Sequence, residues 1–182
     1  MYARQGWSGH ALQPPHQLYT VSVHGGKPQP LLPRYERSRV DPDISPDGRR
    51  MLVTKELADN TFSVWEVDLS TGSEREVISH AGGEHQARYS PDGRDIAFMS
   101  VRSGERNIYR ANIDGTGIVA LTHSLPGIVN EDPCWSPDGS KIMFMSNREG
   151  HSAAYVMRRD GTGQTRLSLP QAVEGHPVWG PT

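Results

Sequence analysis

Short apolar segments separated by tight polar turns recur along the whole chain. Three of them, RRMLVTK, DIAFMS and KIMFMS, are rich in long apolar, β-branched and aromatic residues, and each is too short for a stable helix. Each is followed by a segment with a central aromatic residue, in the order VWEVDL, IYRANI and AYVMRR. A glycine turn and a further short segment, REVIS, VALT or TRLS, come next. The pattern predicts many short strands joined by tight turns, and hence an all-β fold.

These segments belong to a repeat of 44 to 46 residues. The string SPDG stands at 45–48, 90–93 and 136–139, which are spacings of 45 and 46 residues. Aromatic residues outside these strings recur at nearly the same interval: Tyr19, Trp65, Tyr109 and Tyr155 are separated by 46, 44 and 46 residues. Counting the short segment that ends at each SPDG, one repeat holds four antiparallel strands, which is the size of one propeller blade.

Four such blades account for the 182 residues. The predicted blades cover approximately 41–79, 86–122, 132–168, and 176–182 together with 1–32. In the last of these, GHPVWG supplies the first strand, YARQGWS the second, and LYTVSV and PLL the third and fourth. Pairing of the two chain ends closes the ring without a bare sheet edge, and a closed ring predicts a monomer. We therefore expect one β-propeller domain of four-stranded antiparallel blades, with a fragment of a larger propeller as the alternative.

The repeat resembles that of a known family. WSPDG, then IAFMS with a basic residue, then IY, DG and LT, is similar to the TolB-like repeat, a relative of the WD-repeat propellers. The best copies are 134–150 and 97–122, while the first copy departs from the pattern with Ile44 in place of an aromatic residue. The resemblance implies a propeller over nearly the whole chain. Members of the family usually have more blades, so a piece of a larger TolB-like propeller or of a propeller-peptidase stays open.

Composition and charge narrow the range of partners. Nineteen basic and twenty-one acidic residues give a net charge of −2 with no long basic run, so nucleic acid is not an expected partner. No apolar run reaches the roughly 20 residues that cross a bilayer. The first residues lack the apolar core of a signal peptide, which predicts a cytoplasmic protein, or a periplasmic or secreted one if the N-terminus is truncated. Cys134 is the only cysteine and excludes an internal disulfide.

No catalytic residue is predicted. The aspartates of the SPDG strings, Asp47, Asp92 and Asp138, belong to turns in which proline presets φ, aspartate bonds the backbone and glycine takes a positive φ. The segment GWSGH lacks the second glycine of a nucleophile elbow.

The positions before each SPDG are the candidates for ligand binding, because the innermost strands of a propeller enter the central channel there. Four residues before each turn stand Asp41, Gln86, Asp132 and His176, and beside them lie Glu84, His85, Glu131 and Glu174. A ring of such carboxylates and imidazoles could hold a polar ligand or a divalent cation. The simpler alternative is a set of solvated loop residues.

One side of the predicted propeller is also rich in protonatable side chains. The loops between strands two and three, and between successive blades, open on the same side and hold seven of the eight histidines. Other members of this predicted face are Arg102, Arg106, Arg148 and His151. Histidines titrate near neutral pH, so binding there is expected to respond to pH or metal. We predict a non-catalytic binding or scaffolding module that recognises a protein, peptide or carbohydrate through this face. The alternative is a metal-assisted lyase or hydrolase at the channel mouth.

Overall fold

The computed structural model describes residues 2–3, 15–32, 35–167 and 177–179, and every regular element in these ranges is a β-strand. An N-terminal sheet contains β1 (Tyr2–Ala3), β2 (Leu18–Thr20) and β3 (Gln29–Pro30). Blade 1 contains β4 (Arg39–Ile44), β5 (Arg50–Glu56), β6 (Phe62–Asp68) and β7 (Glu74–Ile78). Blade 2 contains β8 (Glu84–Tyr89), β9 (Asp95–Ser100), β10 (Asn107–Asn112) and β11 (Val119–Ala120). Blade 3 contains β12 (Asn130–Trp135), β13 (Lys141–Ser146), β14 (Ala153–Arg158) and β15 (Thr165–Arg166).

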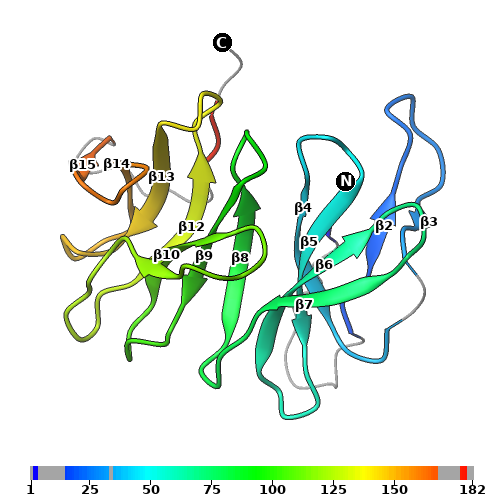
Figure 1. Ribbon diagram of the computed structural model, residues 1–182, viewed down its shortest axis with the longest axis horizontal. Helices are drawn as coiled ribbons and strands as arrows, with labels where there is room; N and C mark the ends of the chain where they lie inside the picture. Colours follow the sequence, from blue (N-terminus) through cyan, green and yellow to red (C-terminus); the bar gives the residue numbers. More distant parts are fainter. Residues whose placement is uncertain (1, 4–14, 33–34, 168–176, 180–182) are drawn as a thin grey trace.

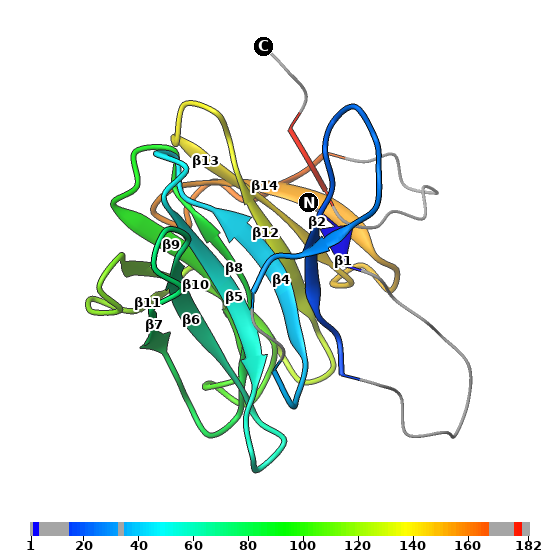
Figure 2. The same ribbon diagram turned by 90° about the vertical axis from the view of Figure 1, so that its right-hand side faces the viewer.

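The four-stranded antiparallel blades predicted from the repeat are confirmed. In each blade the strands pair in sequence order, and the first strand lies at the inner edge. The inner strand β8 contacts both β4 and β12, so the first strands of the three blades are neighbours, with blade 2 between blades 1 and 3 (Figures 1 and 2). The strands begin two residues earlier than the blade boundaries drawn from sequence, at Arg39, Glu84 and Asn130.

The second strand of each blade is buried on both faces, which explains why its centre is a run of consecutive apolar residues. Alternate side chains of a strand point to opposite faces of the sheet. In β9, Ile96 and Phe98 therefore join the core between blades 1 and 2, whereas Ala97 and Met99 join the core between blades 2 and 3. The interface between blades 1 and 2 and the interface between blades 2 and 3 are thus each a hydrophobic core supplied by both sheets.

The SPDG segments form the turns expected of them, and the serine adds a contact that proline and glycine rules do not predict. In blade 2, the Ser90 hydroxyl donates to Asp92 Oδ1 at 2.6 Å and accepts from the Asp95 N–H at 2.9 Å. Gly93 has φ of +67°, in the left-handed region that favours glycine. The same serine–aspartate bond, also 2.6 Å long, recurs in blades 1 and 3.

The described residues near the N-terminus and near the C-terminus lie beside different blades. The N-terminal sheet packs on blade 1 through Leu18, which joins the core formed by Met51 and Val53. Residues 177–179 lie beside blade 3, where the Trp179 indole N–H donates to the Cys134 carbonyl at 3.1 Å (Figure 1). These three residues form no strand, and within the described part of the chain β1 pairs with β2 alone. The rest of the predicted closing strand GHPVWG, residues 175, 176 and 180, lies outside the described residues, so ring closure and a monomeric state stay predictions.

Candidate ligand-binding face

The antiparallel strands give the blades two different ends. The turn face is the end that carries the SPDG turns 45–48, 90–93 and 136–139, seen at the top of Figure 1. The loop face is the opposite end, where each second strand finishes and each inner strand begins. Its segments are 57–61, 79–83, 101–106, 121–129 and 147–152. The loop face is therefore the side on which the sequence placed most histidines.

The channel-mouth positions predicted from the repeat occupy equivalent places in a β-bulge of each inner strand. Asp41, Gln86 and Asp132 have φ of 53°, 56° and 53°, a left-handed conformation that is uncommon outside glycine. The strand register shifts at the same point in β4, β8 and β12, so one extra residue is inserted there. His176, the fourth predicted member, lies outside the described residues, as does Glu174.

These side chains connect one blade to the next. The Gln86 N–H donates to Asp41 Oδ2 at 3.3 Å, and the Asp132 N–H donates to Gln86 Oε1 at 2.9 Å. Two residues further along β4, Asp43 Oδ2 accepts from the Tyr89 N–H at 2.8 Å, and burial raises the pKa of Asp43 above its ordinary value. Polar side chains at these positions thus satisfy backbone groups of the neighbouring inner strand, which is a structural use of residues that the sequence analysis considered for ligand binding.

At the loop end of blade 2, Glu84 and Arg102 form a closed ion pair. Arg102 Nη2 donates to Glu84 Oε1 at 2.5 Å, and Glu84 is fully buried. Arg102 Nε is anchored on the Ser100 hydroxyl at 3.1 Å, and its guanidinium lies 5.2 Å from the centre of the Tyr109 ring. Desolvation raises the pKa of Glu84 even though the arginine opposes that shift. The charge of Arg102 is therefore neutralised within the blade.

At the loop end of blade 3, an arginine with the same anchors meets a neutral partner. Arg148 Nε donates to the Ser146 hydroxyl at 3.0 Å, and its guanidinium lies 4.5 Å from the centre of the Tyr155 ring. Where blade 2 has Glu84, blade 3 has Asn130, whose Oδ1 accepts from Arg148 Nη2 at 2.9 Å. Gln164 Oε1 accepts from Arg148 Nη1 at 2.7 Å. Burial lowers the pKa of Arg148, and no carboxylate among the described residues lies within ion-pair distance of it.

Arg148 lies in the wall of a pocket between blades 2 and 3. The pocket has a volume of about 400 Å³, and its lining combines polar and aliphatic side chains. The lining residues are His123, Ser124, Leu125, Ile128, Asn130, Arg148 and Gln164. This size is at the lower end of the range for small-molecule sites.

The other predicted members of the loop face are not among the residues that line this pocket, but Arg106 adjoins it, because its carbonyl accepts a hydrogen bond from the N–H of Asn130 at 3.0 Å. Arg106 is exposed and forms an ion pair with Glu131 at 3.1 Å. His85 packs against the Phe62 ring at a centroid distance of 4.6 Å, and burial lowers its pKa. His151 Nε2 lies 2.8 Å from Arg166 Nη2 at the outer edge of blade 3. Among the described residues the structure therefore links Asp41, Gln86 and Asp132 in a chain, pairs Glu84 with Arg102 and Arg106 with Glu131, and leaves His85 and His151 beside residues that were not predicted.

Metal binding is not supported by a cluster in the described part of the chain. No group of three or more histidine, cysteine, aspartate or glutamate side chains there is placed to hold a metal ion. Since His176 and Glu174 fall outside that part, the divalent cation and the metal-assisted reaction remain predictions. Among the described residues, no helix is long and apolar enough to cross a membrane.

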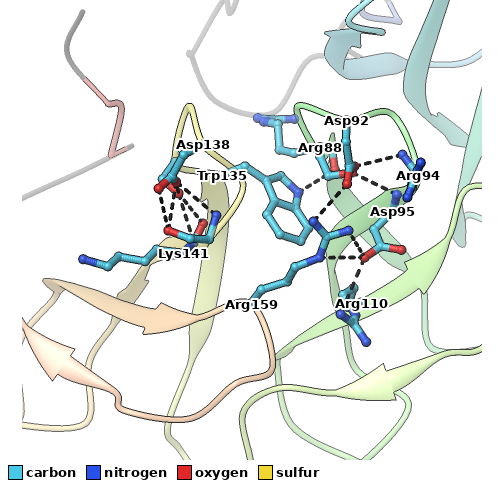
Figure 3. A network of polar contacts seen from close by, with 12 residues as sticks. Arg88, Asp92, Arg94, Asp95, Arg110, Trp135, Asp138, Lys141 and Arg159 are labelled. Atoms are coloured by element: carbon cyan, nitrogen blue, oxygen red, sulfur yellow. Dashed lines mark hydrogen bonds and ion pairs between the residues drawn. The ribbon is translucent and has the colours of Figure 1, made fainter. Parts of the chain in front are cut away.

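On the turn face, a network that the sequence analysis missed links blades 2 and 3 (Figure 3). Arg159, just after β14, reaches across to Asp95 Oδ2 at 2.7 Å and to Asp92 Oδ2 at 3.1 Å. Its guanidinium lies 5.2 Å from the centre of the Trp135 ring, and the Trp135 indole N–H donates to the Arg88 carbonyl at 3.1 Å. Polar groups of the turn face are thus engaged in holding the two blades together.

Comparisons with known proteins agree with this fold. Residues 11–182 match the model of the TolB beta propeller domain. An uncharacterized protein of Agrobacterium fabrum is 32% identical over 113 residues, which are 60% of this chain and 36% of that protein. The Tol-Pal system protein TolB of Wolinella succinogenes is 32% identical over 103 residues, covering 56% of this chain and 24% of that protein. The structure of TolB from Acinetobacter baumannii superposes with a TM-score of 0.77 at 21% identity, covering 90% of this chain and 40% of that one. The chain therefore spans well under half the length of these relatives.

Proposed function

Because the chain belongs to the TolB beta propeller domain family, we propose that it is a non-catalytic binding module that recognises a peptide segment of a partner protein through its loop face. The observation that carries this proposal is the pocket of about 400 Å³ between blades 2 and 3. Rigid blades below variable loops are a common way to present a recognition surface.

The distribution of satisfied polar groups supports the choice of face. On the turn face the three SPDG aspartates accept hydrogen bonds from their own turns, and Arg159 is paired with two of the aspartates of blade 2. On the loop face the guanidinium of Arg148 is bonded to the neutral side chains of Asn130 and Gln164. Leu125, which lines the same pocket, is 75% exposed. A surface that combines hydrogen-bond donors with an exposed aliphatic group suits a peptide, because a peptide offers both carbonyl oxygens and apolar side chains.

The test is a selection of peptide binders followed by a matched pair of charge reversals. Peptides from a random display library are selected on the full chain, and their affinities are measured by calorimetry. Arg106→Glu alters the loop face, and Arg94→Glu makes the same change on the turn face, where Arg94 is equally an exposed arginine. We expect Arg106→Glu to weaken the selected peptides at least about tenfold, an energy of roughly 1.4 kcal/mol, and Arg94→Glu to leave their affinities unchanged.

Two results would count against the proposal. One is a selection that yields no peptide with measurable affinity, and the other is a set of peptides whose binding depends on Arg94 and not on Arg106. The compartment in which the chain works stays a prediction from its sequence.

A further inference from the structure

The pocket between blades 2 and 3 contains a cation without a carboxylate partner among the described residues. Arg148 carries five N–H donors, of which one on Nε, one on Nη1 and one on Nη2 are bound to Ser146, Gln164 and Asn130. These three bonds use one of the two N–H groups on each terminal nitrogen, so a second N–H on each has no partner in these bonds. Two donors on neighbouring nitrogens are the set with which arginine binds a carboxylate through two parallel hydrogen bonds.

Comparison of the blades shows that this is a specific departure from the repeat. Arg102 and Arg148 occupy equivalent positions 46 residues apart, and both are anchored on a serine hydroxyl and an aromatic ring. In blade 2 the position that faces the arginine is Glu84, and in blade 3 it is Asn130. Replacing a carboxylate by an amide keeps the hydrogen bond and leaves the positive charge uncancelled.

A buried network fixes the orientation of the Asn130 amide. Its Nδ2 donates to the Ser124 hydroxyl at 2.6 Å and to Asn107 Oδ1 at 3.2 Å. Asn107 Oδ1 also accepts from the Thr122 hydroxyl at 2.8 Å. Because the amide nitrogen is engaged on this side, the oxygen is the atom that faces Arg148, so the guanidinium is held in place before any ligand arrives.

The nearest acidic side chain of the same loop is already engaged elsewhere. Glu149 attracts Arg148 at longer range, and its Oε2 forms an ion pair with Arg166 Nη1 at 2.5 Å. Leu125 and Ile128 supply the aliphatic part of the pocket lining. The pocket thus offers the positive charge of Arg148 next to a small apolar surface, with the His123 imidazole also in its lining.

We propose that this pocket binds a carboxylate that carries a small aliphatic group, with Arg148 as the anion-binding residue. The proposal rests on the proposed function, since it names the ligand chemistry of the same face. A peptide with a free C-terminal aliphatic residue and a small free acid share this chemistry. The guanidinium fork fits both carboxylate and phosphate, and the aliphatic lining from Leu125 and Ile128 favours a carboxylate that carries an aliphatic group.

The experiment follows the Arg148 Nε–H signal by nuclear magnetic resonance while small probes are added to the full chain. N-acetyl-L-leucine stands for a peptide terminus, isocaproate for a free acid, and N-acetyl-L-leucinamide for the same group without charge. We expect saturable shifts with one or both acids and at least tenfold weaker binding of the amide. Tighter binding of N-acetyl-L-leucine indicates a peptide terminus, and tighter binding of isocaproate indicates a free acid.

Two variants test the role of the charge. Asn130→Asp is nearly isosteric and places a carboxylate beside Arg148 as in blade 2, so it is expected to weaken the acids at least tenfold, although it also removes the two hydrogen bonds that the amide donates to Ser124 and Asn107. Arg148→Gln is expected to do the same, and Arg94→Gln on the turn face serves as the unaffected control. A thermal melt of each variant verifies folding.

The proposal is overturned if the amide binds as well as the acids, if Asn130→Asp binds them normally, or if inorganic phosphate is preferred. Failure of both acids while selected peptides still require Arg106 would overturn this proposal alone. Such a result would leave the proposed function standing.

Discussion

The two ends of the blades use the same repeat in different ways. On the turn face, Ser45, Ser90 and Ser136 each donate to the aspartate two residues later at 2.6 Å, so three copies of the turn are nearly identical. On the loop face, the equivalent arginines of blades 2 and 3 keep their anchors and change their partners, from Glu84 to Asn130. Repetition is thus retained where the fold needs a turn, and variation is found where a pocket opens.

Blade 1 has a third arrangement at the position where blades 2 and 3 have an arginine over an aromatic ring. There the cation over the equivalent aromatic ring is Lys55, which lies 3.9 Å from the centre of the Trp65 ring. Lys55 Nζ is paired with Glu74 at 2.6 Å, and Arg39 binds the other oxygen of the same carboxylate at 2.6 Å. In blades 1 and 2 the cation over this ring is therefore paired with a carboxylate of its own blade, whereas in blade 3 Arg148 has no carboxylate partner among the described residues.

The largest expected effect is a difference in stability between two arginine variants, one at the loop end of blade 2, where the arginine has a carboxylate partner, and one at the loop end of blade 3, where its partners are neutral. Arg102→Ala leaves Glu84 buried without its counter-ion, and breaking such a pair costs about 3–5 kcal/mol of unfolding free energy. Arg148→Ala removes hydrogen bonds to neutral groups and a contact with the Tyr155 ring, for about 1–2 kcal/mol. Urea denaturation of both variants measures the difference.

Equal losses of unfolding free energy in Arg102→Ala and Arg148→Ala would contradict the proposed difference between blades 2 and 3, because the two arginines would then contribute equally to stability. Arg94→Ala is the control, since this exposed arginine on the turn face forms neither the ion pair of Arg102 nor the side-chain hydrogen bonds of Arg148.

The next effect tests whether the turns are equivalent in energy as well as in geometry. Ser90→Ala removes a buried hydroxyl that donates to Asp92 and accepts from the Asp95 N–H, and the expected loss is about 1–3 kcal/mol. Ser45→Ala and Ser136→Ala should each lose nearly the same amount, since both hydroxyls make the matching pair of bonds. Chemical denaturation of the three variants under one condition provides the values.

A spread among the three serine variants as wide as that between the two arginine variants would show that the turn face is no more uniform than the loop face. Ser140→Ala is a suitable control, because its exposed hydroxyl bonds Asp138 at the rim of the turn.

The fold was predictable because its repeated parts depend on local rules. Proline, aspartate and glycine are required by the turn itself, so their spacing marks every blade whatever packs around it. Apolar runs such as DIAFMS identify the strands that are buried on both faces. The serine of the turn was missed as a contributor, although its presence in all three copies was a visible signal.

The candidate binding face was less predictable because its contacts join residues from different strands and blades. Gln164 reaches Arg148 from the hairpin before β15, and Arg159 reaches Asp95 across a blade interface. Alignment of the repeats does place Asn130 opposite Glu84, but only the spatial arrangement shows that the exchange leaves a charge beside a pocket. In the same way, Asp41 and Gln86 look like ligand groups in sequence and bond neighbouring backbone in space.

The smallest expected effect is a difference of sign in the pH dependence of the two faces. On the turn face, the bond from Ser90 is the main reason that the pKa of Asp92 falls to about 2. A lowered pKa in the folded state stabilises the fold above the unfolded value of 3.8, and this contribution is lost as pH falls toward 2. On the loop face, burial raises the pKa of Glu84, so its contribution is complete below 4.5 and declines as pH rises through the folded value.

Asp92→Asn and Glu84→Gln should therefore differ from the wild type in opposite directions along a pH series. The stability advantage of the wild type over Asp92→Asn is expected to shrink between pH 4 and pH 2. Its advantage over Glu84→Gln is expected to shrink as pH rises above about 4.5, because only the wild type must ionise a buried carboxylate. Denaturation midpoints measured from pH 2 to pH 8 give both curves. If the Glu84→Gln curve instead follows that of Asp92→Asn, then Arg102 more than offsets the burial of Glu84, and the loop end of blade 2 is as strongly stabilised by charge as the turns are.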